Sequence, residues 1–211
     1  YMLIQDKPVL YYSLKAFQDS FVDEIILVTS AEDITFCDEE IVQKYGFTKV
    51  HQIVAGGKER YHSVYAGIEQ LQDCEIVFIH DGARPMLSGE MLERLYQDVK
   101  KTGACVAGMP AKDTIKIADE EGNIAMTPDR NLVWTIQTPQ VFSYELIHRA
   151  YEELIANEEN LRKKGIHITD DAMVVEHFWN HPVHLVEGSY ENIKITTPED
   201  LAIAQQFLLK M

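Results

Sequence analysis

Apolar runs of strand length alternate with segments of helical periodicity along the first half of this chain. Four strands are predicted, at Glu24–Thr29, Lys49–Val54, Ile76–His80 and Ala104–Met109. Apolar residues at helical spacing precede each of them: Leu10, Leu14 and Phe17; Ile34–Tyr45; Val64, Ile68 and Leu71; and Leu92, Leu95 and Val99 after an N-cap at Ser88. This alternation is typical of an α/β fold, a mostly parallel twisted sheet flanked by helices. No linker breaks the pattern, so we expect one domain over residues 1–211.

The pattern changes after Met109. Two extended segments, Thr114–Ala118 and Asn123–Trp134, surround a turn and predict a projecting β-arm over about residues 114–134. Further helices are expected at Ser143–Asn157, from Thr169 and from Thr197-Pro198, with a strand at Val183–Val186. Because an isolated hairpin is only marginally stable, we expect the arm to pack on a partner subunit.

The predicted strand Ile76–His80 ends in a cluster of charged side chains, with Asp81 and Arg84 directly after His80. In open α/β sheets, ligands bind beyond the carboxyl ends of the strands. A His-Asp-x-x-Arg sequence at such an end therefore indicates a binding site. The alternative is a solvated strand end that carries an Asp–Arg pair.

A Gly56-Gly57 pair follows the second predicted strand and precedes a helix. Glycines allow backbone N–H groups to approach an anion, and the helix N-terminus adds positive potential. Arg60 and Ser63 lie in the first turn of that helix and can reach a phosphate, a ribose or a base. A tight turn also needs glycine, so a purely structural role is the alternative.

Three further segments carry candidate ligand-binding groups. Arg130 precedes the unusual run Gln137–Gln140, in which Thr138 offers a hydroxyl; Arg130 can clamp a phosphate at two points, or the run is simply a polar loop shaped by proline. Lys194 lies between two isoleucines and points away from them, into solvent or toward the edge of the sheet. Thr169-Asp170-Asp171 has two interpretations. It is a site for a polyol or a metal, or it is the start of a helix, where acidic side chains interact favourably with the helix dipole.

Composition restricts the partners and the compartment. A net charge of −15 disfavours binding to nucleic acid and to anionic membranes. No apolar run approaches the length of about 18 residues that a membrane span needs, and no signal peptide is recognisable. Cys37, Cys74 and Cys105 are far apart and include no CxxC motif, which argues against disulfides and zinc and predicts a reducing, cytoplasmic location.

Taken together, these segments resemble one family, the 2-C-methyl-D-erythritol 4-phosphate cytidylyltransferases of the non-mevalonate isoprenoid pathway. The matching residues span almost the whole chain in the family's order: Lys7–Leu10, Gly56-Gly57 with Arg60 and Ser63-Val64, His80–Pro85, Asp113–Lys116, Arg130 with Trp134 and Gln137–Gln140, Thr169–Asp171, and Asn192–Thr196. No single motif is decisive, but seven in the same order are highly specific.

The resemblance implies a Rossmann-like nucleotidyltransferase fold whose β-arm builds a homodimer. It implies a reaction that joins CTP and 2-C-methyl-D-erythritol 4-phosphate to give CDP-methylerythritol and pyrophosphate, with Mg²⁺ or another divalent cation. The attacking group is a phosphate monoester, which is already ionised near neutral pH because its second pKa is about 6. Catalysis is then positioning and charge neutralisation for in-line attack, without a general base.

The matching motifs also imply roles for individual residues. Those expected at the cytidine end of CTP are Gly56, Gly57, Ser63 and Ala83, with Arg60 either contacting the nucleotide or bracing the loop. Those expected at the second substrate are Asp81, Arg84, Thr138, Thr169 and Arg130. Arg130, Lys194 and Asp81 are the expected catalytic residues; Lys194 would also contact the nucleotide, and Asp81 is the candidate metal ligand. Arg130 lies at the base of the arm and is a candidate for the neighbouring subunit's site.

The family pattern starts with a strand and a Gly-rich loop that holds an Arg and a Lys, and neither is found from Tyr1 onward. We therefore expect the chain as written to be truncated: either it is inactive in that form, or the segment was left out because the loop is mobile. Two alternatives remain open for the function. One is a ribitol 5-phosphate cytidylyltransferase with the same nucleotide half, and the other is a non-catalytic nucleotide-binding module.

Overall fold

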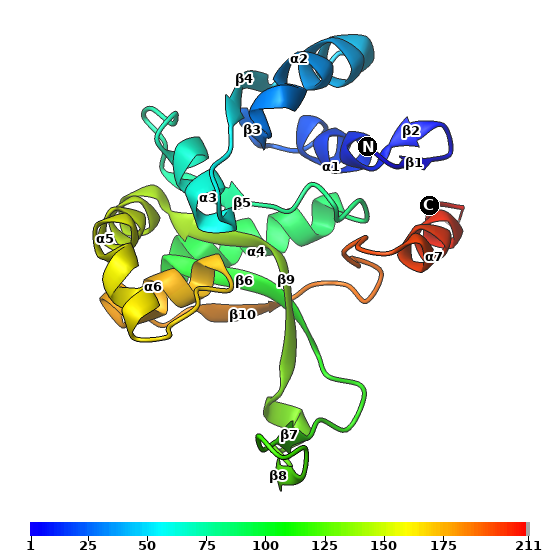
Figure 1. The fold of residues 1–211 in the computed structure, drawn as a ribbon. Helices are drawn as coiled ribbons and strands as arrows, with labels where there is room; N and C mark the ends of the chain where they lie inside the picture. The colour runs from blue at the N-terminus through cyan, green and yellow to red at the C-terminus, as the bar shows by residue number, and fades with distance from the viewer. Residues whose placement is uncertain (210–211) are drawn as a thin grey trace.

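A computed structural model describes residues 1–209 and shows an α/β fold with a central four-stranded sheet (Figure 1). The first half contains, in order, β1 (Leu3–Ile4), β2 (Lys7–Pro8), α1 (Val9–Gln18), β3 (Ile25–Thr29), a 3₁₀ turn (Ala31–Asp33), α2 (Ile34–Phe36) continued by a π-helical stretch (Cys37–Gln43), β4 (Val50–Ala55), α3 (Arg60–Ile68), β5 (Ile76–Ile79), α4 (Gly89–Thr102) and β6 (Ala104–Pro110). The second half contains β7 (Ile117–Ala118), β8 (Ile124–Met126), a 3₁₀ turn (Arg130–Leu132), β9 (Trp134–Ser143), α5 (Tyr144–Lys163), α6 (Asp171–Trp179), β10 (His184–Glu187) and α7 (Pro198–Leu208). The predicted α/β class is confirmed.

The central sheet has the strand order β10-β6-β9-β5. β10 runs parallel to β6, whereas β9 runs antiparallel to both β6 and β5. The arm between β6 and β9 reverses the chain, so these two strands pair as the legs of one long hairpin. The Gln137–Gln140 run therefore lies inside a central strand, with a cis Thr138–Pro139 peptide bond, and is not a loop. Asn192–Thr196, expected to be extended, forms no strand.

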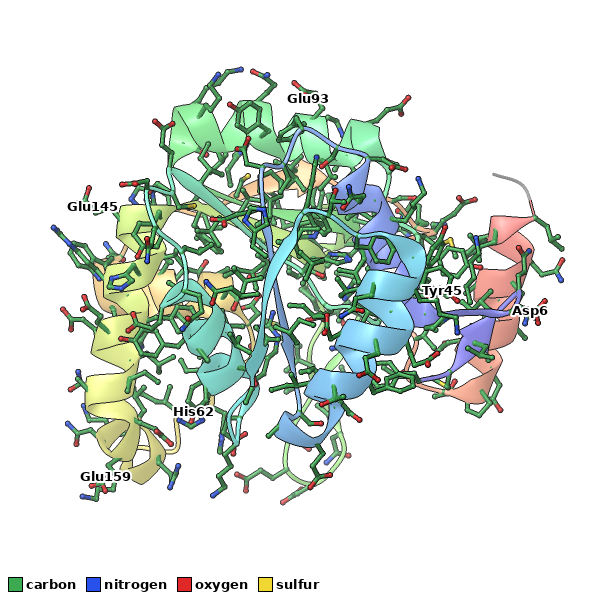
Figure 2. The ribbon with its side chains drawn as sticks, turned by 90° about the horizontal axis from the view of Figure 1, so that it is seen from above. Asp6, Tyr45, His62, Glu93, Glu145 and Glu159 are labelled. Atoms are coloured by element: carbon green, nitrogen blue, oxygen red, sulfur yellow. The ribbon has the colours of Figure 1, made fainter. Side chains whose placement is uncertain are left out.

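Alternation along the central strands produces two cores, one on each face of the sheet. In β6, Ala104 and Val106 face α3, α5 and α6, whereas Cys105 and Ala107 face α4. This follows from the period of two in a strand, which sends successive side chains to opposite faces. Viewed from above, α4 and α5 lie at the periphery, with the exposed acids Glu93 and Glu145 pointing outward (Figure 2).

β3 and β4 form a separate parallel pair that is not hydrogen-bonded to β5. A cavity of about 1230 Å³ lies between β3 and β5 and is lined by both strands. At the carboxyl ends of the strands its lining includes Thr29, Arg60 and Asp81. The cavity extends along the whole length of β3 and β5, and only its end at Thr29 and Asp81 lies where open α/β sheets bind their ligands.

The arm projects from the body of the molecule (Figure 1). Its two short strands, β7 and β8, pair antiparallel, as the sequence predicts, but the second expected segment, Asn123–Trp134, is interrupted by the 3₁₀ turn Arg130–Leu132. Its exposed side chains include four large apolar residues: Ile117, Ile124, Met126 and Leu132. Within one subunit these apolar groups are left in water.

The N-caps predicted for two helices are present in the structure. Ser88 caps α4 by accepting a hydrogen bond from the Met91 N–H, and Thr197 caps α7 ahead of Pro198. No helix among residues 1–209 is long and apolar enough to cross a membrane. All three cysteines are free.

The core beneath α4 gives a stability prediction. Leu95 is fully buried between this helix and the sheet. Leu95→Ala removes its contacts and leaves a cavity, so we expect the free energy of unfolding to fall by about 2–5 kcal/mol. Gln97→Ala, on the exposed face of the same helix, is the matched control and should change it by no more than about 0.5 kcal/mol. Urea denaturation measures both, and equal effects would contradict the assigned core.

Candidate active site

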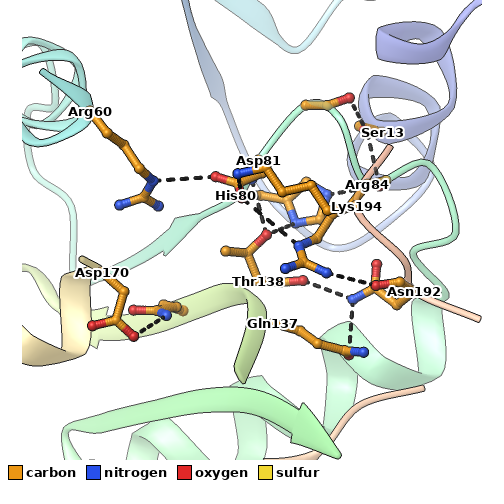
Figure 3. A network of polar contacts seen from close by, with 12 residues as sticks. Ser13, Arg60, His80, Asp81, Arg84, Gln137, Thr138, Asp170, Asn192 and Lys194 are labelled. Atoms are coloured by element: carbon orange, nitrogen blue, oxygen red, sulfur yellow. Dashed lines mark hydrogen bonds and ion pairs between the residues drawn. The ribbon is translucent and has the colours of Figure 1, made fainter. Parts of the chain in front are cut away.

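The loop after β5 is held by a chain of hydrogen bonds that starts on β9. The Asp81 N–H donates to Thr138 Oγ1 (3.0 Å), and Thr138 Oγ1 lies 3.1 Å from His80 Nδ1. His80 Nε2 lies 3.1 Å from the Arg84 carbonyl, which can only accept, so the Nε2 atom carries the proton. Burial lowers the pKa of His80 to about 4, which leaves the ring neutral at pH 7. His80 and Thr138 therefore fix the shape of the loop (Figure 3).

Three cations surround the Asp81 carboxylate (Figure 3). Lys194 Nζ lies 2.9 Å from Asp81 Oδ2, Arg60 Nε 3.3 Å from Oδ1, and Arg84 Nε 3.9 Å from Oδ2. Burial by itself would raise the pKa of Asp81, but the hydrogen bond from Lys194 and the charges of Arg60, Lys194 and Arg84 lower it below its usual value. Asp81 is therefore ionised at neutral pH, and cationic charge exceeds anionic charge around it.

Arg84 is the most buried of these cations, with 13% of its side chain exposed. Its Nη1 donates to the Asn192 carbonyl (2.8 Å), and burial lowers its pKa. Among the described residues its Nε has no hydrogen-bond partner. The Ala83 carbonyl accepts from the Ile195 N–H (2.9 Å), so residues 83–84 bind the segment that carries Lys194.

Arg60 forms a two-point ion pair with a second carboxylate. Its Nη1 and Nη2 each lie 2.8 Å from an oxygen of Asp171, which is fully buried at the start of α6. Burial would lower the pKa of Arg60, but the hydrogen bonds and charge of Asp171 outweigh it and raise the pKa above its usual value. Three guanidinium nitrogens are thus bound to protein carboxylates, which favours the bracing alternative for this residue.

The Gly56-Gly57 turn has tight internal contacts. A Cβ atom at Gly57 would lie 2.3 Å from His62 Cβ, and one at Gly56 would lie 2.6 Å from Ser63 Oγ. Ser63 Oγ accepts from the Gly57 N–H (3.1 Å). The turn therefore needs glycine for steric reasons alone. Ser63 and Ala83 also line the cavity between β3 and β5.

Two glutamines of β9 tie the remaining site segments to the sheet. Gln137 donates to the Ser189 carbonyl (2.7 Å), and its Oε1 accepts from Asn192 (3.2 Å). Gln140 donates to Asp170 (3.0 Å) and accepts from the Ala172 N–H (2.8 Å) at the start of α6. No individual signal in the sequence pointed to these roles, because a glutamine in a polar run is equally typical of a solvated side chain.

Two predicted site residues lie apart from the Asp81 cluster. Arg130 donates to the Lys112 carbonyl (3.2 Å) at the base of the arm and contacts no described residue of the cluster. Thr169 is exposed just before α6, with its hydroxyl 3.7 Å from Met173 Sδ. Asp170, next to it, is the N-cap of α6. Within this chain, Arg130 therefore does not join the other candidates.

The donor set does not suit a preformed Mg²⁺ site. Within residues 1–209 no three His, Cys, Asp or Glu side chains are placed to hold a metal ion. Both oxygens of Asp81 already face cations, and both oxygens of Asp171 bind Arg60. Mg²⁺ usually takes one or two carboxylates together with substrate phosphates. Such an ion would therefore need to take most of its ligands from the substrate and from water.

The family model of 2-C-methyl-D-erythritol 4-phosphate cytidylyltransferase matches residues 1–210. A protein of that name from Lachnospira eligens is 50% identical over 209 residues, which cover 99% of this chain and 89% of the relative. A protein of the same name from Lachnoclostridium phytofermentans is 48% identical over 208 residues, which cover 99% of this chain and 87% of the relative.

Solved structures agree with these matches. A 4-diphosphocytidyl-2C-methyl-D-erythritol synthase from Anaerococcus prevotii superposes with a TM-score of 0.88 at 34% identity, covering 99% of this chain and 89% of that one. A 2-C-methyl-D-erythritol 4-phosphate cytidylyltransferase from Francisella tularensis gives 0.79 at 30% identity, covering 98% and 90%. The resemblance seen in the motifs is confirmed, and the chain belongs to the 2-C-methyl-D-erythritol 4-phosphate cytidylyltransferase family.

Proposed function

We propose that this protein joins CTP and 2-C-methyl-D-erythritol 4-phosphate to give CDP-methylerythritol and pyrophosphate. The observation that carries the proposal is the cluster of Arg60, Arg84 and Lys194 around Asp81, at the carboxyl end of β5. An excess of cations in a chain with a net charge of −15 suits two phosphorylated substrates.

The chemistry requires charge neutralisation more than proton transfer. The attacking phosphate oxygen is ionised near neutral pH, with a second pKa of about 6. His80 is not placed as a general base, because both of its ring nitrogens are bound within the protein. In-line attack on the α-phosphorus then depends on holding two anions together and on stabilising the leaving pyrophosphate.

Lys194 and Arg84 are the cations best placed for this task. The Lys194 side chain is 44% exposed, so its ammonium can turn from Asp81 to an incoming phosphate. Arg84 offers a buried Nε–H that lacks a partner among the described residues, and such a donor calls for an acceptor. We assign both to the phosphate of the second substrate, with Asp81 setting their positions. A divalent cation, if used, arrives with the triphosphate.

The remaining assignments follow from family membership and are proposals too. Gly56, Gly57, Ser63 and Ala83 surround the cytidine end. Thr138 acts by shaping the loop after β5, since its hydroxyl is already bound to Asp81 and His80. Thr169 is exposed at the start of α6, where it can meet the polyol. The protein functions without nucleic acid or membrane, and its three free cysteines suit a cytoplasmic location.

The nucleotide and the acceptor are tested together by measuring pyrophosphate release from the full-length protein. We expect methylerythritol phosphate with CTP to react, and CTP to exceed ATP and GTP by ~10⁴-fold in kcat/KM, because sites that hydrogen-bond a base edge reject analogues strongly. Activity with ribitol 5-phosphate instead would reassign the acceptor. Binding of CTP without any turnover would indicate a nucleotide-binding module. Equal turnover of CTP and ATP would refute the nucleotide assignment.

The arm is proposed as the contact that makes a homodimer, because Ile117, Ile124, Met126 and Leu132 are exposed on it. Deleting only the tip, Asp119–Asn123, should weaken the dimer less than removing residues 114–134, since the tip carries none of these four side chains. Sedimentation equilibrium measures both variants. A wild-type protein that is monomeric at micromolar concentration would disprove the assignment.

Arg130 is proposed to serve the neighbouring subunit's site, because in its own chain it contacts none of the described cluster. Arg130→Ala should raise KM for the polyol phosphate and lower kcat, with a loss of about 2–4 kcal/mol in kcat/KM and CTP binding nearly intact. Arg130→Lys should rescue only partly, since a point charge lacks the planar fork.

A mixed dimer decides which subunit Arg130 serves. Combining an Arg130→Ala chain with a Lys194→Ala chain should restore activity, because one site then carries both lesions and the other carries neither. Turnover of the mixed dimer is compared with that of each parent. If heterodimers form without regaining activity, Arg130 does not act across the interface.

A further inference from the structure

Arg60 binds a carboxylate that is itself hydrogen-bonded to a buried tyrosine. Tyr151, on α5, is fully buried and donates its hydroxyl to Asp171 Oδ1. Asp171 is also fully buried, and both of its oxygens bind the Arg60 guanidinium at 2.8 Å. Removing a charge of this kind from water is costly unless it is fully paired, so Asp171 and Arg60 hold one another in a single arrangement.

The Arg60 guanidinium also contacts the candidate active site through Asp81. Arg60 Nε lies 3.3 Å from Asp81 Oδ1, while Lys194 Nζ occupies the other oxygen, Oδ2, at 2.9 Å. Asp171 binds both terminal nitrogens of the Arg60 guanidinium and thereby orients Nε toward one oxygen of Asp81. The chain of contacts runs from α5 through α6 and α3 to the loop after β5 and ends on a lysine.

We propose that Asp171, supported by Tyr151, is a positioning residue that acts through Arg60 on Asp81 and so sets the place of Lys194. Its catalytic consequence rests on the proposed function, but the coupling itself does not. Asp171 and Lys194 share no contact in the described structure, so their coupling requires the two residues between them. Arg60 is then a brace and not a ligand of the nucleotide.

The coupling is tested without substrate by a double-mutant cycle of Asp171→Asn and Lys194→Met in the full-length protein, measured by urea unfolding. Without the Asp171 carboxylate, the charge of Arg60 is no longer neutralised, so Arg60 binds Asp81 more strongly in competition with Lys194. Loss of Lys194 should then lower the free energy of unfolding by less than it does in the wild type. We expect the unfolding equilibrium constant of the double variant to depart from the product of the single effects by about fivefold or more. The departure should vanish when Arg60→Met is added.

Two controls make the cycle specific. Glu158 on α5 binds His62 of α3, much as Asp171 binds Arg60, but this pair has no described contact with Asp81. Glu158→Gln combined with Lys194→Met should therefore be additive within about twofold. If Asp171→Asn does not fold, Tyr151→Phe, which removes one hydrogen bond and no charge, takes its place and should give a smaller departure of the same sign. Additivity of either variant with Lys194→Met would overturn the proposal.

A kinetic measurement separates positioning from a general structural role and from nucleotide binding. Arg60→Met combined with Asp171→Leu and Tyr151→Phe replaces the polar chain by apolar groups and is expected to remain folded, as buried ion pairs often can be replaced in this way. Its kcat should fall about tenfold or more while the Kd for CTP changes less than about threefold. Full kcat in the folded variant, or a matching loss of CTP affinity, would overturn the proposal. An inactive wild-type protein that still shows the coupling would count against the proposed function alone.

Discussion

Three polar side chains on one central strand hold the candidate active site together. From β9, Thr138 fixes the loop after β5, Gln137 binds the 189–192 segment, and Gln140 binds the start of α6. All three are nearly fully buried, so each unmade hydrogen bond would leave an unsatisfied group in the core. The three segments that carry Asp81, Lys194 and Asp171 are thus fixed relative to one central strand.

The charged side chains of the site carry a small local excess of positive charge. Arg60, Arg84 and Lys194 face Asp81 and Asp171, so one positive charge remains unmatched. The rest of the protein is strongly acidic, and exposed acids such as Glu93 and Glu145 lie on the outer helix surfaces. Partial burial strengthens the interactions within the cluster, because water screens them less than it screens the surface charges. This local excess is why we propose that a phosphate binds here although the molecule as a whole repels anions.

Most elements could be predicted because their signals are local. Leu92, Leu95 and Val99 repeat at helical spacing, and Ser88 is a typical cap, so the start and the buried face of α4 were predictable. β9 (Trp134–Ser143) was not predicted at all, since the polar run Gln137–Gln140 and Pro139 conceal it, and hydrophobic pattern does not show which way a strand pairs. The structural role of Thr138 was not predicted either. Its hydroxyl binds His80 and Asp81, which lie far away in the sequence, so no local pattern indicates the contact.

The sequence by itself determined the alternation of strands and helices, the two-faced core, the arm and the order of the family's motifs, because each of these depends on residues a few positions apart. Only the tertiary structure decided the partners of the charged groups. Arg60 and Asp171 are separated by 111 positions, and nothing in either neighbourhood identifies the other. An ion pair is defined by distance in space, and that distance exists only after the sheet has brought the ends of its strands and loops together.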